Sequence, residues 1–435
     1  MYKKYFIKEK GESCMKKFKN ILLITLAMML TLTVGCKGKN EATSKEAKKL
    51  TVAVNFAQTE ATFKELQEIA KEFEKENQGI TVEIVTYPDY ENTMQTKMGV
   101  GDLPDLMATH GWSVMRYGEY LEPLQNREWA SKINSSIKSI MTDKDGTIYA
   151  LPMDYDIAGV AFNKDVLDEV GVDPFKIKTW DDFKAACEKI KQAGKTPLYI
   201  GGSKDDWTIG NFFDWVAPSF LITNDNKNYR EELVDGTFDW SNWEEVAQLL
   251  VDLQKLGYIN KNVNEGTWPE VGEQLAKGNA AFTFFGNYVI GEAKKFNENG
   301  NYGFMPVPSN SKDDKPAYIT GERVALGVYK DSPAKEEGLK FIDFLAKPEN
   351  VNRVAKVSGN PTGLVGEGYK TDAGEMNQYF EKAKDYRGFG YFDRVYLPSG
   401  MWGSLCKTGS GLVAGTMTPE DAAEQMKADY NKLRK

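Results

Sequence analysis

Strand-like and helix-like segments alternate along the chain from Leu50 onward, and this pattern restricts the fold more than any other feature. LTVAVNF at 50–56 has the hydrophobic pattern of a strand. The helical pattern behind it has Thr62 as its expected N-cap, with Glu65 completing a capping box. Further strands are predicted at 80–87 and 104–110, and a further helix at 90–99. Strands that alternate with helices predict an α/β fold with a mostly parallel sheet and helices on both faces.

The same alternation returns in the second half of the chain. Thr179 is the expected N-cap of a helix, and Ser332-Pro333 and Thr418-Pro419 each pair an N-cap residue with a proline at the first helical position. Strands are predicted at 196–202 and 280–286, and a helix at 243–256. A chain of 435 residues is too long for one hydrophobic core, so we expect two lobes.

The composition favours a protein that binds reversibly over an enzyme. The sequence has one histidine and four cysteines, which excludes multi-histidine metal sites and a disulfide scaffold. The net charge of -8 argues against nucleic acid as the main partner, because phosphate binding needs a basic surface. Aromatic rings are plentiful, with 9 Trp, 21 Tyr and 22 Phe. We therefore expect a binding protein without catalytic residues, metal or cofactor.

The N-terminal segment has the pattern of a secretory signal. Basic residues after Met15 precede a short apolar run that ends at Gly35-Cys36, which predicts a signal peptide at 15–35. The run is too short to span a membrane, which takes ~20 apolar residues. Cys36 directly after Gly35 resembles a bacterial lipobox, so we expect lipidation of Cys36. Ordinary secretion with an unmodified cysteine is the alternative.

Two further segments flank this signal. Residues 1–14 place acidic residues ahead of the basic segment, so we interpret them as an untranslated leader and Met15 as the initiator. Residues 36–49 are polar, small and without aromatic rings, which is typical of a flexible tether. These segments predict a protein on the outer face of the cell membrane, held there by its lipid anchor alone.

A few residues could still carry chemistry. Asp154 and Asp156 flank Tyr155, and in an extended segment they share a face, as the acid pair of a glycoside hydrolase could. A surface-anchored hydrolase that uses these two carboxylates is therefore the alternative function. Cys187 lies on the apolar face of a predicted helix and is expected to be a buried free thiol, although a disulfide with Cys406 stays open.

Several segments together resemble the extracytoplasmic solute-binding proteins of carbohydrate ABC importers, the family related to maltose-binding protein. The most specific is IYALPMDYDIAGVAFNKDVLDEVGVDPFKIKTWDDF at 148–183, with Tyr-x-x-Pro, Asn-Lys-Asp, Gly and Thr-Trp-Asp-x-Phe at the family's spacings. GDLPDLMA, LAKGNAAFTFFGNY, NYGFMPVPS and EEGLKFIDFLAKPEN also fit. The resemblance covers 50–435.

This resemblance implies a two-lobed periplasmic-binding-protein fold of the type II-like class, with a carbohydrate in the cleft. The chain would cross between lobes near 151–160 and 318–324. Lobe 1 would hold 50–153 and 323–366, and lobe 2 would hold 154–322 and 367–435. The implied partners are an oligosaccharide, the permease subunits of an ABC importer and a separate ATPase, and the protein is expected to be a monomer.

Sugar recognition narrows the candidate site residues. Aromatic rings stack on the C–H faces of pyranoses, and planar polar groups bind hydroxyls, so both kinds of side chain are expected on loops after strands and at the crossings. The scarcity of arginine among such positions makes an anionic ligand less favoured. Trp180, Trp215, Trp240 and Trp243 are expected in the core. The candidate ligand-binding residues are Glu60, His110, Trp112, Asp154, Tyr155, Trp207, Asn287, Tyr288, Glu322, Arg323 and Trp402.

Overall fold

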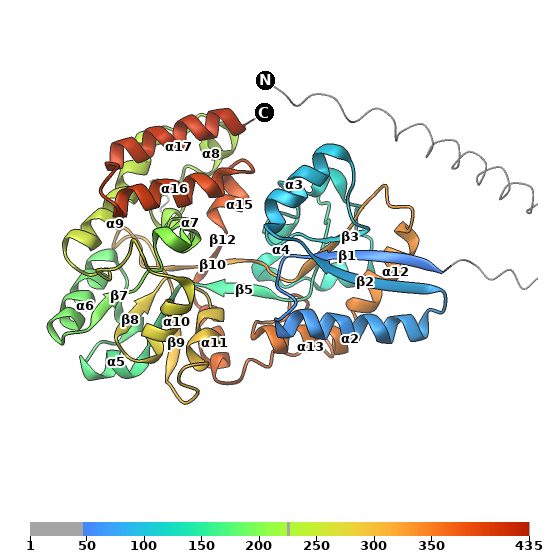
Figure 1. The fold of residues 1–435 in the computed structure, drawn as a ribbon, viewed down its shortest axis with the longest axis horizontal. Helices are drawn as coiled ribbons and strands as arrows, with labels where there is room; N and C mark the ends of the chain where they lie inside the picture. Colours follow the sequence, from blue (N-terminus) through green and yellow to red (C-terminus); the bar gives the residue numbers. More distant parts are fainter. Residues whose placement is uncertain (1–46, 224–226, 435) are drawn as a thin grey trace, which may run out of the picture. The chain divides into compact units, whose positions relative to one another are not determined.

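Three sheets organise the part of the chain that the structure describes, residues 47–223 and 227–434 of a computed structural model (Figure 1). The predicted leader 1–14, the signal peptide 15–35 and Cys36 lie outside the described residues, as does the predicted tether up to residue 46. Among the described residues, no helix is both long enough and apolar enough to cross a membrane.

The first sheet has five strands in the order β2-β1-β3-β11-β4. β1 is parallel to β2 and β3, whereas β11 is antiparallel to β3 and β4. The strands are β1 Lys48–Val54, β2 Ile80–Thr86, β3 Leu106–Ala108, β4 Leu151–Pro152 and β11 Ala325–Val328. The accompanying helices are α2 Ala61–Glu76, α3 Tyr90–Val100, α12 Lys335–Leu345 and α13 Pro348–Ser358. We refer to these elements as the first lobe (Figure 1).

The second sheet has four strands in the order β7-β8-β6-β9, of which only β7 and β8 run parallel. The strands are β6 Val160–Asn163, β7 Thr196–Leu198, β8 Ala280–Thr283 and β9 Tyr302–Met305. Its helices are α5 Lys164–Glu169, α6 Trp180–Gln192, α7 Trp207–Leu221, α8 Arg230–Asp235, α9 Trp243–Lys255, α10 Trp268–Ala276, α11 Tyr288–Lys294, α14 Asn377–Ala383, α15 Phe392–Tyr396, α16 Met401–Val413 and α17 Pro419–Leu433. These elements form the second lobe.

Helix α7 is the central helix of the second lobe. Every residue of α7 after Trp207 is buried, including the polar Asn211 and Asp214. A helix that is apolar on nearly all sides needs neighbours around its circumference, and α9, α15 and α16 all pack against it. This burial fixes the orientation of the side chains that α7 presents toward the first lobe.

A third, three-stranded sheet connects the lobes. It has the order β12-β10-β5, with β5 Tyr155–Ala158, β10 Ala317–Glu322 and β12 Arg387–Gly390. The chain leaves β4 of the first sheet to enter β5, and it leaves β10 to enter β11 of the first sheet. Both crossings lie where the resemblance implied them, and α4 (Ser135–Met141) packs against β10 and β12. The short 3-10 helices are Gly118–Tyr120, Glu128–Lys132, Pro174–Lys176, Ser203–Asp205, Trp240–Asn242 and Gly374–Met376.

The strand directions correct one expectation. The sheets are mixed rather than mostly parallel, because the strands next to each crossing run back against their neighbours. The strands of the first and second sheets fall inside the ranges expected for lobes 1 and 2, but the lobe boundaries themselves stay a prediction. The predicted tether is too long by two residues, since Lys48 and Lys49 pair with Ile80 and Thr81.

The expected helix starts divide into right and wrong ones. Thr179 and Thr418 are N-caps, as predicted, and each also forms a capping box with the residue three positions later. Thr62 does not cap α2, because the helix already begins at Ala61 and Thr62 is buried inside it. Ser332 does not cap α12 directly; its hydroxyl accepts a hydrogen bond from the Ala334 amide in a turn before the helix.

The cysteine alternatives are also decided. Cys187 and Cys406 are both buried and free, so the disulfide between them is wrong. Burial raises the pKa of both thiols, which keeps them protonated and unreactive at neutral pH.

Candidate functional site

A cavity of about 650 Å³ lies between the two lobes. Its first-lobe wall comes from the ends of β1 and β3 and from the start of α3, and its second-lobe wall comes from α7, α11, α15 and α16. We call it the inner cavity. It is lined by Asn55, Asp89, Tyr90, Glu91, His110, Trp112, Asp156, Trp207, Asn211, Trp215, Tyr288, Arg323, Tyr391, Arg394 and Trp402. The carboxyl ends of strands are where ligands bind in open α/β sheets.

Six of the sequence-predicted residues line the inner cavity. They are His110, Trp112, Trp207, Tyr288, Arg323 and Trp402. All six follow a strand, lie at a crossing or occupy a loop or a helix start, which is why the sequence pattern could find them.

The second-lobe wall is aromatic. Trp207, Tyr288 and Trp402 are partly exposed, and Trp207 is braced by Trp268, whose ring centroid lies 5.0 Å away. Trp215 was expected in the core and is indeed only 2% exposed, but its ring also reaches the cavity. Partly exposed rings held by neighbouring rings are suited to stacking on a ligand with an apolar face.

His110 and Asn55 form the floor on the first-lobe side. The Asn55 amide donates to His110 Nδ1 at 2.6 Å. Burial lowers the pKa of His110 well below its usual range, so the imidazole is neutral and can accept this bond. His110 and Gly111 both have positive φ, 42° and 88°, and this turn directs the following Trp112 toward the second lobe. Asn55 Oδ1 has no hydrogen-bond partner among the described residues.

Trp112 is covered by two guanidinium groups. Arg116 lies 3.8 Å and Arg394 lies 4.4 Å from its ring centroid, and Trp112 is only 5% exposed. Arg116 is held in turn by an ion pair of 2.5 Å with Glu91. The cation–π contacts therefore cover the Trp112 ring, and its role in ligand binding stays a prediction.

Arg323 and Arg394 bring donors to the cavity. Arg323 lies 3.7 Å from Glu60, 3.8 Å from Asp154 and 4.0 Å from Asp156, which are loose ion pairs. The Nη1 atoms of both arginines are buried without a hydrogen-bond partner in the described part of the chain. Buried donors without partners are costly, so both groups are poised to donate to a ligand oxygen.

Asp156 contributes an acceptor that the structure holds firmly. The Tyr391 hydroxyl donates to Asp156 Oδ2, and the Asn360 amide donates to Asp156 Oδ1 at 3.1 Å. Burial raises the pKa of Asp156, an effect that the charge of Arg323 partly offsets. The same Asn360 amide donates to Asp154 at 3.1 Å, so one side chain ties both carboxylates to the hinge region.

Five predicted residues do not line the inner cavity. Asp154 is fully buried and accepts from the Val324 amide at 2.6 Å, and Glu322 is buried beneath Ser113. Glu60 holds Arg323 from outside, and the Asn287 amide donates to the Gly359 carbonyl. Tyr155 lines a separate cavity on the other face of the connecting sheet, because alternate residues of β5 point to opposite faces.

Sequence reasoning missed several lining residues. Asn55 follows β1 directly and carried the same post-strand signal as the residues that were found. Asn211 lies in mid-helix. Tyr391 directly follows β12 and Arg394 lies in α15 behind it, but no strand was predicted at 387–390, so nothing marked these two residues. Only the packing of α7 and α15 brings these side chains to the cavity.

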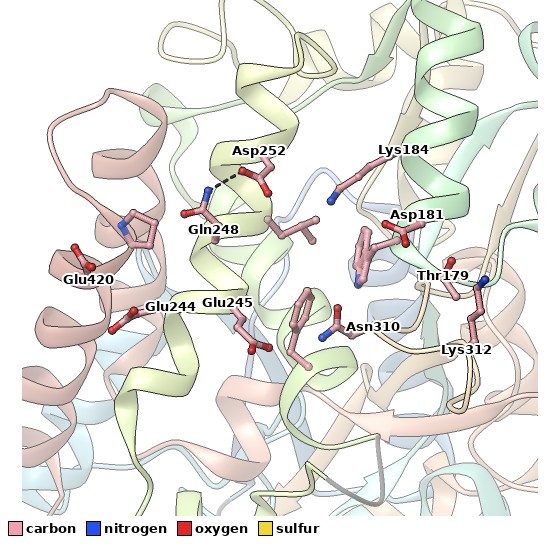
Figure 2. A pocket seen from close by; sticks show the side chains of 14 residues that line it. Thr179, Asp181, Lys184, Glu244, Glu245, Gln248, Asp252, Asn310, Lys312 and Glu420 are labelled. Carbon is pink, nitrogen blue, oxygen red and sulfur yellow. Dashed lines mark hydrogen bonds between the residues drawn. The ribbon is translucent and has the colours of Figure 1, made fainter.

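A hollow of about 650 Å³ lies within the second lobe, away from this site. Figure 2 shows side chains of α6, α9 and α17 around it, with the carboxylates of Asp181, Glu244, Glu245 and Asp252 and the amines of Lys184 and Lys312. None of the predicted ligand-binding residues lines this hollow, and it receives nothing from the first lobe.

The sequence profile of bacterial extracellular solute-binding proteins matches residues 57–352. The chain belongs to this family. The solute-binding protein is 33% identical to the melibiose/raffinose/stachyose-binding protein MelE of Bacillus subtilis, over 96% of this chain and 97% of that one. Membership indicates an extracytoplasmic location.

Solved structures of similar proteins agree with this family membership. The solute-binding protein is similar to the binding protein MsmE of Bacillus subtilis in an open conformation, with a TM-score of 0.83, 33% identity and coverage of 89% of this chain and 98% of that one. It is also similar to a sugar transporter protein of Bacillus licheniformis in complex with stachyose, with a TM-score of 0.79, 34% identity and coverage of 89% and 100%. These similarities confirm the two-lobed α/β fold.

The same relatives decide between binding and catalysis. They are binding proteins of sugar transport, so the expected non-enzymatic function is confirmed, and these relatives give the glycoside hydrolase alternative no support. The geometry gives the physical reason: Asp154 does not reach the cavity, and both carboxylates of the supposed acid pair are bound by Asn360.

Proposed function

We propose that this protein captures an oligosaccharide of the melibiose, raffinose and stachyose type in the inner cavity. The observation that carries the proposal is that both lobes supply polar groups and rings to one cavity, and that several of those polar groups lack partners among residues 47–223 and 227–434. The similarity to MelE over nearly the whole length supports the choice of ligand class.

The lining suits a neutral, polyhydroxylated ligand. Trp207, Tyr288 and Trp402 can stack on the C–H faces of the sugar rings, while the arginine donors and the Asn55 and Asp156 acceptors bind hydroxyls. The cavity carries two arginines, Arg323 and Arg394, against the carboxylates of Asp89, Glu91 and Asp156. Carboxylates therefore outnumber arginines in this lining, which disfavours an anionic ligand.

Binding is coupled to lobe closure in this proposal. A sugar that touches both walls favours the state in which the walls are close, which is the differential affinity that a population shift requires. The β4–β5 and β10–β11 crossings would absorb the rotation, since they are the strands that pass between the lobes. An affinity in the micromolar range corresponds to about -8 kcal/mol.

The closed protein would deliver the sugar to the permease of an ABC importer, with ATP used by a separate subunit. We further propose that Cys36 is lipidated after removal of 15–35, and that the protein works as a monomer. Growth with a labelled fatty acid tests the anchor: label in the wild type but not in Cys36→Ala supports it, and label in neither would refute it.

A thermal-shift screen tests the ligand class. Melibiose, raffinose, stachyose, maltose, glucose and glycerol phosphate would each be added to the purified domain. Because a ligand that binds only the folded state raises the melting temperature, we expect shifts with the first three. Uniformly flat results would contradict the proposed function.

A further inference from the structure

A cavity of about 730 Å³ lies on the face of the connecting sheet that is turned away from the inner cavity. We call it the rear cavity. Antiparallel pairing sets Thr320 opposite Ile157, and both residues line the rear cavity, as do Tyr155 and Tyr318. Asp156 points to the other face and lines the inner cavity. None of the described residues lines both cavities, so the rear cavity is a separate space.

Two walls rise from this face of the sheet. One comes from the start of α4 and from residues 361–371, which follow α13, and the other comes from α14 with Phe380 and Lys384. The backbone amide of Asn134 donates to the Gly363 carbonyl at 2.9 Å, which ties the two parts of the first wall together. The wall therefore has a fixed backbone, as expected of a largely pre-formed ligand site.

Tyr318 gives the rear cavity a polar group that the protein leaves unsatisfied. The side chain is only 2% exposed, and its hydroxyl has no hydrogen-bond partner among the described residues. The ring is held by Phe304 and Tyr386, whose ring centroids each lie 5.7 Å away. Burial raises the pKa of Tyr318 well above its ordinary value, so the hydroxyl stays protonated. Because a buried donor without a partner is costly, a ligand oxygen that accepts from it would be stabilised.

The rest of the lining is rich in hydroxyl groups. The Asn134 amide donates to the Tyr155 hydroxyl at 3.4 Å, which is a long bond and leaves that hydroxyl able to donate to a ligand. Further hydroxyls on the lining are those of Ser135, Ser136, Ser139, Thr362 and Thr371. Hydroxyl groups beside aromatic rings suit a ligand that carries several hydroxyls on an apolar carbon skeleton.

The charged groups of the lining favour a neutral ligand. Lys384 donates to Glu381 at 2.7 Å. Arg387 donates to the Thr223 carbonyl at 2.8 Å and lies 3.5 Å from Asp314. Both cations therefore already have partners inside the protein, and an anion would have to compete with these carboxylates.

We propose that the rear cavity is a second ligand site, which binds a small neutral polyol on the side of the hinge away from the transported sugar. The Tyr318 hydroxyl donates to one ligand oxygen, and the hydroxyls of Tyr155 and α4 bind others. This inference does not depend on which sugar the inner cavity takes, since the two linings share no residue.

The probe is myo-inositol, a cyclic neutral polyol, and its binding is measured by titration with saturation-transfer NMR on the purified domain. Ser139 is exposed on α4 and lines the rear cavity, so Ser139→Trp fills the space. Ser131 is the matched control, because it is also exposed but lines neither cavity. We expect saturable binding to the wild type, at least fivefold weaker binding to Ser139→Trp, and an affinity within twofold of the wild type for Ser131→Trp.

Tyr318→Phe tests the unpartnered hydroxyl without filling the cavity. It should weaken inositol binding at least fivefold and leave the melting temperature at or above the wild-type value, since the hydroxyl it removes has no partner in the described part of the chain. Trp402→Ala, in the inner cavity, should bind inositol as the wild type does. The absence of saturable binding to the wild type, an unchanged affinity in Tyr318→Phe, or loss of inositol binding in Trp402→Ala overturns the inference. None of these three results bears on raffinose binding, which is measured separately.

Discussion

The guanidinium of Arg394 lies 4.4 Å from the ring centroid of Trp112, so a helix of the second lobe contacts a loop of the first. The fit is close: a Cβ on Gly111 would come within 2.5 Å of Arg394 Cδ. Arg394 also lies 4.0 Å from the Tyr391 ring. The arginine is thus held by two aromatic rings from different lobes while its Nη1 stays without a partner among the described residues.

Replacement of Arg394 by Ala should weaken sugar binding at least tenfold. The substitution removes both the unpartnered donor and the contact that joins the walls, and a hydrogen bond to a charged group contributes about 1.5–3 kcal/mol. Calorimetry with raffinose measures the change. Arg127→Ala, in the first lobe and outside the inner cavity, is the control. An affinity within twofold of the wild type for Arg394→Ala would remove Arg394 from the site.

Trp402→Ala should also lower the affinity tenfold or more. Trp402 is partly exposed in the first turn of α16 and lines the inner cavity, so its ring is available for stacking. Trp402→Phe keeps an aromatic face and should recover most of the loss. If Ala and Phe bind sugar equally well, stacking at this position is refuted.

Asp154→Ala should destabilise the fold. The substitution leaves the buried Val324 amide without its acceptor and removes one of the two carboxylates that accept from the Asn360 amide, at a cost of about 1–3 kcal/mol. Asp154→Asn keeps an acceptor oxygen and should cost less. Urea unfolding compares the three proteins. Equal stability of Asp154→Ala and the wild type would show that Asp154 does not brace the crossing.

The stability of the protein should include a component that falls as the pH rises from about 4 to about 7. Burial, together with the neighbouring Asp393, raises the pKa of Asp214 to about 7, and burial raises the pKa of Asp393 to about 6. Between the ordinary pKa of 3.8 and these values the folded state binds more protons than the unfolded state, so stability decreases with pH.

Asp214→Asn isolates this component. The amide oxygen can still accept from the Asp393 backbone, as Asp214 does at 2.6 Å, but it cannot ionise. Relative to the wild type, the variant should gain free energy of unfolding across this window, by at most ~1.4 kcal/mol per pH unit. Urea unfolding at pH 4, 5.5 and 7 measures it, and a difference that does not change with pH contradicts the assignment.

The sequence predicted the elements better than their directions. Helix and strand periodicities are local, so the elements from β1 to α3 were found within a few residues. The antiparallel course of β11 was missed because it depends on the crossings, which no local pattern encodes. The predicted N-cap at Thr62 was also wrong. The Ala57 amide donates a hydrogen bond to the Glu60 carboxylate in the turn before α2, and the helix begins at Ala61.

The candidate site residues show the same difference between what local sequence patterns predict and what depends on tertiary packing. Trp207, Tyr288 and Trp402 were predictable because they follow strands or begin helices. Tyr155 lines the cavity on the other face of the connecting sheet, because the alternation of β5 turns Asp156 rather than Tyr155 toward the inner cavity. Arg394 was not predictable, since only the packing of α15 against α7 brings it over Trp112.

A crystal structure of the protein with raffinose tests the central claim most directly. The account predicts sugar density in the inner cavity, with rings against Trp207, Tyr288 or Trp402 and hydroxyls bound by Arg323 or Arg394, so that one ligand touches both lobes. Density confined to the second-lobe hollow of Figure 2, or an empty inner cavity at saturating raffinose, would contradict it.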